Sequence, residues 1–198
     1  MTDTIANNSE TQRQRILQVT TELIESEGLQ AISARKIASR MQCAVGSLYR
    51  PFENLKSILT AVNIETLKQL EHHVLQAAQP ASTAKEKITR MAMAYTDYVM
   101  AHHHLWQTVM QNFDTNHQQL SSDYQQQQQR MFQCIESELT RLHPTQSSQA
   151  IKLEVRTLWA GIDGICNLGM RGKLERNGEE GIQVLTDILL QRFLGGEQ

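Results

Sequence analysis

The chain has 198 residues, of which 40% are hydrophobic and 20% charged, a balance typical of a soluble globular protein with one large or two smaller domains. No apolar run approaches the ~20 residues that a membrane span requires, and the polar N-terminus does not resemble a signal peptide. Three widely spaced cysteines exclude a disulfide framework and a CxxC metal site. We therefore expect a cytoplasmic protein with no cofactor and no membrane partner.

The net charge of −2 hides an uneven distribution of charge along the chain. Between Leu29 and Thr60 there are five basic residues and a single acidic residue, Glu53, so the remainder of the chain is clearly acidic. A basic segment on an acidic body is typical of a protein that contacts phosphate groups at one end only.

The first predicted helix begins at Asn8 or Ser9, after a short arm (residues 1 to 8) that we expect to be disordered. It ends at Gly28, a residue type common just after a helix. Its inward positions recur at helical spacing and are Ile16, Thr20, Leu23 and Ile24.

The run from Ala31 to Leu59 predicts two short helices at a tight turn, followed at once by a third helix. Ser33 caps the first short helix, Met41–Cys43 make the turn, and residues 44–50 form the second short helix. Pro51 ends this helix, because the residue before a proline is displaced from the α region. This arrangement is that of a helix-turn-helix, whose second helix enters the major groove of DNA.

These residues resemble the N-terminal DNA-binding domain of the TetR family of bacterial transcriptional regulators. The elements that match, in order and without gaps, are Arg15–Gly28, Ser33-x-Arg35-Lys36-Ile37-Ala38, Val45-Gly46-Ser47-Leu48-Tyr49, Phe52 and Leu59. Two positions depart from the family pattern. Pro51 stands where the family usually has histidine or a similar residue, and Leu55 stands where it usually has a phosphate-contacting lysine, with Lys56 one position later.

The predicted DNA-contacting residues are Ser33, Arg35, Lys36, Ala44, Val45, Gly46, Ser47, Tyr49, Arg50 and Lys56. The resemblance implies that Val45 and Gly46 meet base edges and that Tyr49 contacts the DNA backbone. The cationic side chains suit phosphate, and a serine hydroxyl suits either a base or a phosphate. The alternatives are a packing role for Tyr49 and ordinary solvated charges for Arg35 and Lys36.

Further helices are expected at about residues 54–79, 83–101, 105–112, 116–142, 147–169 and 178–194. Asn54 and Thr83 are the expected caps of the first two, and Pro80 and Pro144 fall between helices. The fold class is therefore all-α, with about nine helices. We expect a three-helix DNA-binding domain at residues 9–53 and a larger ligand-binding and dimerisation domain at residues 54–198.

The last two predicted helices, 147–169 and 178–194, are apolar over broad faces, which favours a homodimer through a four-helix bundle. An effector pocket is expected among Trp106, Met110, Phe113, Tyr124, Met131, Trp159, Asp163 and Cys166. Asp163 is the candidate for a polar or cationic ligand group, because a buried acid needs a partner. Trp159–Gly164 also resembles a Trp-x-x-x-His-Gly run of TetR-family ligand domains, with Asp163 replacing the histidine. A plain core role is the alternative for each.

The run His102–His104 suggests a metal site, but three consecutive side chains point in different directions and one metal would meet at most two of them. We expect these histidines instead to cap the preceding helix at its C-terminus, where the helix dipole favours a positive charge.

These features together predict a DNA-binding, ligand-responsive transcriptional regulator. Repression is the expected mode, with release from a palindromic double-stranded DNA operator when a small molecule binds. One alternative is a helical-bundle enzyme or metal carrier, but the sequence has no Glu-x-x-His pairs, haem motif, phosphate-binding glycine loop or nucleophile motif. The other is a DNA-binding factor with no small-molecule effector.

Overall fold

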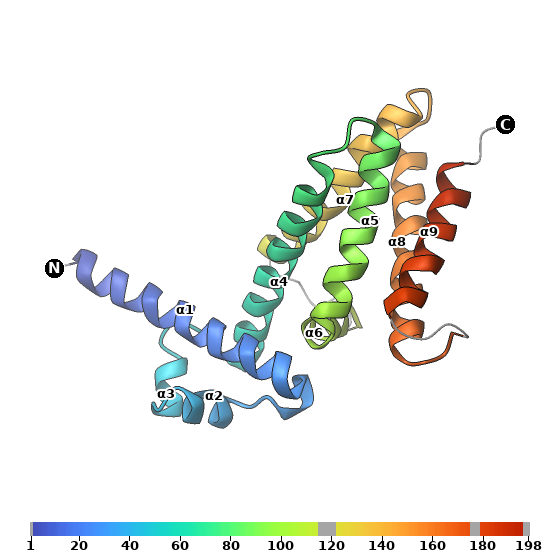
Figure 1. Ribbon diagram of the computed structural model, residues 1–198. Coiled ribbons are helices and arrows are strands. Elements are labelled where there is room, and N and C mark those ends of the chain that lie inside the picture. The colour runs from blue at the N-terminus through green and yellow to red at the C-terminus, as the bar shows by residue number, and fades with distance from the viewer. Residues whose placement is uncertain (1, 115–121, 175–178, 196–198) are drawn as a thin grey trace. The chain divides into compact units, whose positions relative to one another are not determined.

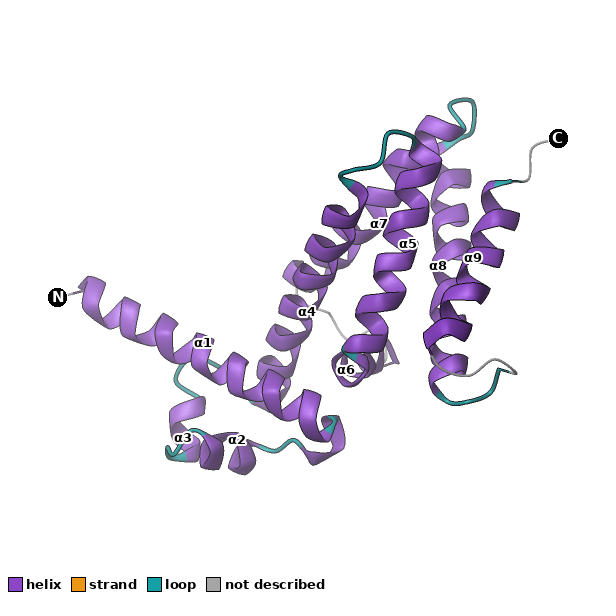
Figure 2. Ribbon diagram, viewed as in Figure 1, coloured by secondary structure: helices purple, strands orange, loops and turns teal. Residues whose placement is uncertain are grey.

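The computed structural model describes residues 2–114, 122–174 and 179–195, which consist of helices and turns without a strand (Figure 1 and Figure 2). The helices are α1 (Thr2–Glu27), the 3-10 helix η1 (Leu29–Ala31), α2 (Ala34–Arg40), α3 (Val45–Leu48), α4 (Leu55–Ala78), α5 (Ala84–Ala101), α6 (His103–Asp114), α7 (Ser122–Leu142), α8 (Ser148–Met170) and α9 (Glu179–Leu194). The predicted all-α fold with about nine helices is confirmed.

The chain divides into two compact units. The first unit contains α1, α2, α3 and α6, together with α4 as far as Thr66 and the start of α7 as far as Tyr124. The second unit contains α5, α8 and α9, together with α4 from Leu67 and the rest of α7. This division reflects which residues pack together. The boundary between a DNA-binding domain and a ligand-binding domain at residues 53 and 54 is a functional one and stays a prediction.

The core of the first unit is built from the apolar positions of the helix-turn-helix and its neighbours. The side chains that are completely shielded from solvent are Ile16, Ile24, Ile37, Leu48, Ile58 and Val62. Each such side chain contributes about 1.5–3 kcal/mol through burial of apolar surface. The predicted inward positions of the first helix are confirmed, and Thr20 can be buried among them because its hydroxyl donates to the Ile16 carbonyl at 2.7 Å.

Helices α4 and α6 also meet through a buried polar contact. Asn63 is fully buried, and its Nδ2 donates to the main-chain oxygen of Thr108 at 3.2 Å. The Thr108 hydroxyl in turn donates to the His104 carbonyl at 3.0 Å. The amide nitrogen of Asn63 is thus bonded within the core, where leaving it without an acceptor would be costly.

The helix-turn-helix has the predicted order but a shorter second helix. Ser33 caps α2 by accepting from the Lys36 backbone N–H at 3.3 Å, as expected. Gln42 in the turn has φ +55°, a left-handed value that costs a non-glycine residue about 1–2 kcal/mol. Helix α3 covers only residues 45–48, and residues 49–51 form a turn, so the predicted extent of 44–50 is wrong. The restriction that Pro51 places on Arg50 explains the early end.

The first helix begins earlier than expected. Helix α1 starts at Thr2, so the prediction that residues 1 to 8 form a disordered arm is wrong for residues 2 to 8. This segment contains no glycine or proline, and extending an existing helix needs no new nucleus. The later boundaries that fall within the described residues agree closely with the prediction, whereas the predicted helix starts at 116 and 178 lie outside them. At the start of α4, Asn54 accepts from the Ser57 N–H at 2.9 Å while Ser57 Oγ accepts from the Asn54 N–H at 3.1 Å.

In the second unit, α5, α8 and α9 lie side by side (Figure 1). A side chain added at either of two glycines of α8 would meet α9, at Gly161 against the flexible end of Leu189 and at Gly169 against Ile182. A Cβ atom added at Gly161 would lie 2.8 Å from Leu189 Cδ2, and one added at Gly169 would lie 2.5 Å from Ile182 Cγ1. Ser147 caps α8 by accepting from the Ala150 N–H at 3.2 Å, which places its start as predicted.

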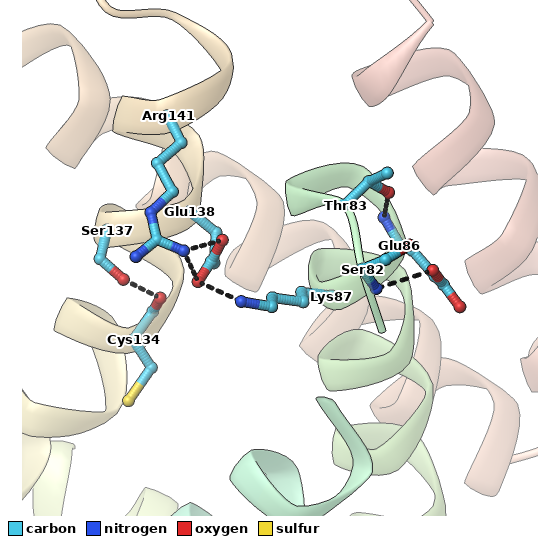
Figure 3. A network of polar contacts seen from close by, with 8 residues as sticks. All are labelled: Ser82, Thr83, Glu86, Lys87, Cys134, Ser137, Glu138 and Arg141. Atoms are coloured by element: carbon cyan, nitrogen blue, oxygen red, sulfur yellow. Dashed lines mark hydrogen bonds and ion pairs between the residues drawn. The ribbon is translucent and has the colours of Figure 1, made fainter. Parts of the chain in front are cut away.

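An ion pair between Lys87 and Glu138 joins α5 to α7 in this unit (Figure 3). Glu138 is buried and accepts from Arg141, a residue of its own helix, at 3.0 and 3.1 Å, while Lys87 on α5 lies 3.4 Å from the same carboxylate. The N-terminus of α5 lies nearby, capped by Thr83, which accepts from the Glu86 N–H at 3.2 Å as predicted. One carboxylate thus holds two cations, so its removal would leave them facing each other.

Candidate nucleic-acid interface

Most of the predicted DNA-contacting residues are exposed on the helix-turn-helix. The exposed members are Ser33, Arg35, Ala44, Gly46, Tyr49, Arg50 and Lys56, and the half-buried members are Lys36, Val45 and Ser47. Tyr49 is 41% exposed, a large fraction for an aromatic side chain. Gly46 is exposed, and no heavy atom of another part of the protein lies within 4 Å of the position that a Cβ atom would take there.

The opposite side of α3 anchors it to the core. Leu48 is completely buried, as predicted, and Val45 packs partly against the same cluster of apolar side chains. Val45 therefore contributes to packing and retains only part of its surface for a base edge. The short helix presents its remaining surface through Ala44, Gly46 and the turn that starts at Tyr49.

Lys36 has a partner within the protein that the sequence did not reveal. Its ammonium group forms an ion pair with Glu27 at the end of α1. Both side chains are partly exposed, so this pair is screened by solvent and stabilises the fold by at most about 1 kcal/mol. A DNA phosphate that binds Lys36 has to compete with the Glu27 carboxylate.

Two residues of α1 that are not among the predicted site residues contact α3 and the segment that follows it. Gln12 Nε2 donates to the Ser47 carbonyl oxygen at 3.1 Å, and the guanidinium carbon of Arg13 lies 5.2 Å from the centre of the Phe52 ring. The signal that could have pointed to them is Pro51, which has no N–H for a preceding carbonyl.

The histidine run binds the end of α1. His102 Nδ1 lies 2.7 Å from Glu25 Oε1, and His104 Nδ1 lies 2.8 Å from the Glu25 carbonyl oxygen. His104 therefore bonds a carbonyl in the last turn of α1, and His102 bonds a carboxylate of that turn, while the expected capping of the helix before them stays a prediction. Among the described residues no group of three metal-binding side chains comes together. Burial, with His104 close by, lowers the pKa of His103.

The predicted effector residues belong to different units. Trp106, Met110 and Tyr124 are in the first unit, with Trp106 and Tyr124 buried, and the side chain of Phe113 lies outside the described residues. The members in the second unit are Met131, Trp159, Asp163 and Cys166. Burial raises the pKa of the Tyr124 phenol to about 12.

In the second unit, Asp163 is the centre of a buried polar network between α5 and α8. The carboxylate is 8% exposed; it accepts from the Tyr95 hydroxyl at 3.0 Å and from Asn167 Nδ2 at 2.8 Å. The Tyr95 oxygen also accepts from Trp159 Nε1 at 3.2 Å. Burial, reinforced by the Asp163 charge, raises the pKa of Tyr95 well above its ordinary value, so the phenol remains a donor. The same two causes raise the pKa of Cys166 to about 12, which makes it an unreactive thiol.

An aromatic pair lies next to this network. The rings of Phe132 and Trp159 meet edge to face with their centres 5.6 Å apart. The guanidinium carbon of Arg156 lies 3.6 Å from the centre of the Phe132 ring. Of the predicted effector residues in this unit, the structure therefore brings Trp159 and Asp163 together through Tyr95, with Cys166 close by in space.

The helices of the described segments are all too short or too polar to cross a lipid bilayer. No curated protein sequence matches the chain. Several solved structures have a similar fold, including a protein of unknown function from Rhodococcus sp. RHA1, with 16% identity, a TM-score of 0.81, and coverage of 93% of this chain and 94% of that one. Another is the transcriptional regulator FadR from Bacillus subtilis in complex with stearoyl-CoA, with 16% identity, a TM-score of 0.73, and coverage of 93% and 99%.

FadR from Bacillus halodurans, described as a fatty acid degradation regulator, is similar at 16% identity with a TM-score of 0.70, covering 94% of this chain and 96% of its own. At such identities the likeness shows the fold. The sequence adds a family match, because residues 88–193 fit the model of the tetracyclin repressor-like C-terminal domain. That match spans more than half of the chain, and the helix-turn-helix precedes it. The protein therefore belongs to the TetR family of transcriptional regulators, which bind DNA and are not enzymes.

Proposed function

We propose that this protein is a cytoplasmic, homodimeric repressor that binds a palindromic DNA operator through α2 and α3 and leaves it when a small molecule binds the C-terminal helices. The main support for the proposed DNA binding is an exposed surface on α2, α3 and their flanking residues, formed by Ser33, Arg35, Gly46, Tyr49 and Arg50. These groups offer a capped helix N-terminus, two guanidinium groups and a phenol, which are the groups that bind phosphate and base edges.

The proposed homodimer forms through α8 and α9. The exposed large apolar side chains on these two helices are Leu153, Leu168, Val184 and Ile188, and Leu153 is 59% exposed. Val184 and Ile188 are four residues apart and so share one side of α9. Covering these side chains with a second copy would remove apolar surface from water and provide the two-fold symmetry that a palindromic operator requires.

The proposed effector site lies among the helices of the second unit, where its candidates are Met131, Trp159, Asp163 and Cys166. Because Asp163 already accepts hydrogen bonds from Tyr95 and Asn167, we propose that a ligand reaches it by exchanging one of these donors for its own. Stearoyl-CoA, which is bound in the similar Bacillus subtilis structure, is a suitable first probe.

The DNA-binding part is tested by a mobility shift of the full-length protein on its own upstream DNA, with a scrambled duplex of equal length as competitor. We expect selective retention, lost at least tenfold in Tyr49→Ala and Arg35→Ala, while Arg171→Ala, an exposed arginine of the second unit, binds as wild type. Arg35→Ala should also reduce the salt dependence by about one phosphate contact. Failure to select any sequence from a random pool would refute the proposal.

The effector part is tested by adding stearoyl-CoA to the retained complex. Release of the DNA by wild type, weakened in Asp163→Asn, would support the proposed site. Release that is unchanged in Asp163→Asn would refute the role of this carboxylate. If neither stearoyl-CoA nor a panel of small polar and cationic compounds binds the protein in calorimetry, the proposed effector site is refuted.

A further inference from the structure

The end of α3 carries a main-chain carbonyl that its own helix cannot satisfy. In a regular α-helix the oxygen of Ser47 accepts from the N–H four residues later, which is residue 51. That residue is Pro51, and proline has no N–H. Helix α3 is only four residues long, so its geometry depends on few hydrogen bonds and each one matters.

Gln12 supplies the missing donor from another helix. Its Nε2 lies 3.1 Å from the Ser47 oxygen, although the two residues are 35 positions apart. The next residue, Arg13, places its guanidinium over Phe52, the residue that follows Pro51. Two consecutive residues of α1 therefore hold the chain on both sides of Pro51.

We propose that Gln12 is a positioning residue of the DNA-reading surface, whose amide replaces the N–H that Pro51 lacks and so fixes the end of α3 and the turn that carries Tyr49 and Arg50. This inference rests on the proposed DNA-binding function. Gln12 acts through the Ser47 carbonyl and need not contact DNA itself. Its loss should weaken operator binding more than non-specific binding, because base readout depends on the orientation of α3 while phosphate attraction depends mainly on charge.

The neighbouring glutamine of α1 provides a matched control. Gln14 Nε2 donates to Glu10 Oε1 at 2.8 Å, along the same exposed side of its own helix. A change at Gln14 therefore removes an amide from the same helix, at a more exposed position, but leaves the Ser47 carbonyl untouched. Methionine is the replacement of choice at both positions, since it keeps the length of the side chain and its helix propensity but cannot donate.

The experiment measures the ratio of affinities for the selected operator and for a scrambled duplex, using full-length protein. Because both duplexes are titrated with the same protein preparation, the ratio of the two affinities does not depend on the fraction of the protein that is folded. Gln12→Met should lower this ratio about fivefold, the effect of one lost hydrogen bond, and Gln14→Met should leave it unchanged. A Gln12→Met ratio equal to that of wild type would overturn the proposal.

A second background separates this role from general packing. In Pro51→Ala the N–H is restored, so Gln12→Met should lower the ratio less than twofold there. An equal fivefold loss in both backgrounds would show that Gln12 acts independently of the missing N–H and would overturn the proposed mechanism. If wild type itself does not distinguish the duplexes, it is the proposed function that fails; if wild type distinguishes them and Gln12→Met does so equally well, only the role of Gln12 fails.

Discussion

The contact between α8 and α9 leaves no room for a side chain at Gly169. A Cβ atom there would lie 2.5 Å from Ile182 Cγ1 and 2.8 Å from Ile182 Cδ1, both closer than carbon atoms pack. Ile182 is buried and β-branched, so the clashing Cγ1 is close to its main chain and cannot rotate away freely. Gly169→Ala therefore forces the two helices apart or moves Ile182 out of its rotamer.

The expected cost can be estimated from two opposing effects. Overpacking of this kind costs about 1–3 kcal/mol. Replacement of glycine by alanine inside a helix stabilises the folded state by up to about 1 kcal/mol. The gain is smaller here because Gly169 is in the last turn of α8. We expect Gly169→Ala to lower the free energy of unfolding by about 1–2 kcal/mol.

Gly164→Ala on the same helix is the matched control, because nothing lies within 4 Å of an added Cβ there. It should raise the free energy of unfolding by about 0.5–1 kcal/mol through helix propensity alone. Urea unfolding at one fixed protein concentration measures both variants, since the stability of an oligomer depends on concentration. Equal stability of Gly169→Ala and Gly164→Ala would refute the inference that this glycine is required by close helix packing.

Three further results are expected from changes elsewhere in the chain. Gln42→Gly should raise the free energy of unfolding by up to about 1 kcal/mol, because glycine adopts φ +55° without strain; a loss of stability in urea unfolding would contradict this. Glu27→Gln should tighten operator binding about two- to fourfold by releasing Lys36 for phosphate, and unchanged affinity in the mobility shift would mean that Lys36 makes no such contact. Cys166, with its pKa raised to about 12, has very little thiolate at pH 8, so iodoacetamide should modify it last in the folded protein, as mass spectrometry would show; rapid modification would show that the thiol is accessible.

Local signals in the sequence were sufficient to place most helices. Ser33, Asn54, Thr83 and Ser147 each cap the helix that follows, through a hydrogen bond to a backbone N–H three residues later. Such bonds depend only on neighbouring residues, and the same holds for the apolar spacing that places Leu48 in the core. The errors at α1 and α3 also have local causes, namely an uninterrupted helix-forming start and the effect of Pro51 on Arg50.

The contacts that join distant segments could not be predicted from one sequence. Gln12 and Ser47, and likewise Tyr95 and Asp163, are brought together by packing of helices that are far apart in the chain. Spacing rules do not specify which side chain of one helix faces which atom of another. For that reason Asp163 was expected to need a ligand as its partner, whereas the structure provides two donors from the protein itself.

The buried bond between Asn63 and Thr108 determines how α6 can move. Apolar side chains tolerate sliding of one helix along another, since one methyl group replaces another at little cost. An amide bonded to a single carbonyl does not tolerate such sliding. A shift of α6 by one helical turn, about 5.4 Å, would separate the Asn63 Nδ2 from its acceptor inside the core. The first part of α4 and α6 should therefore move together, so that a displacement of α6 also displaces the start of α4.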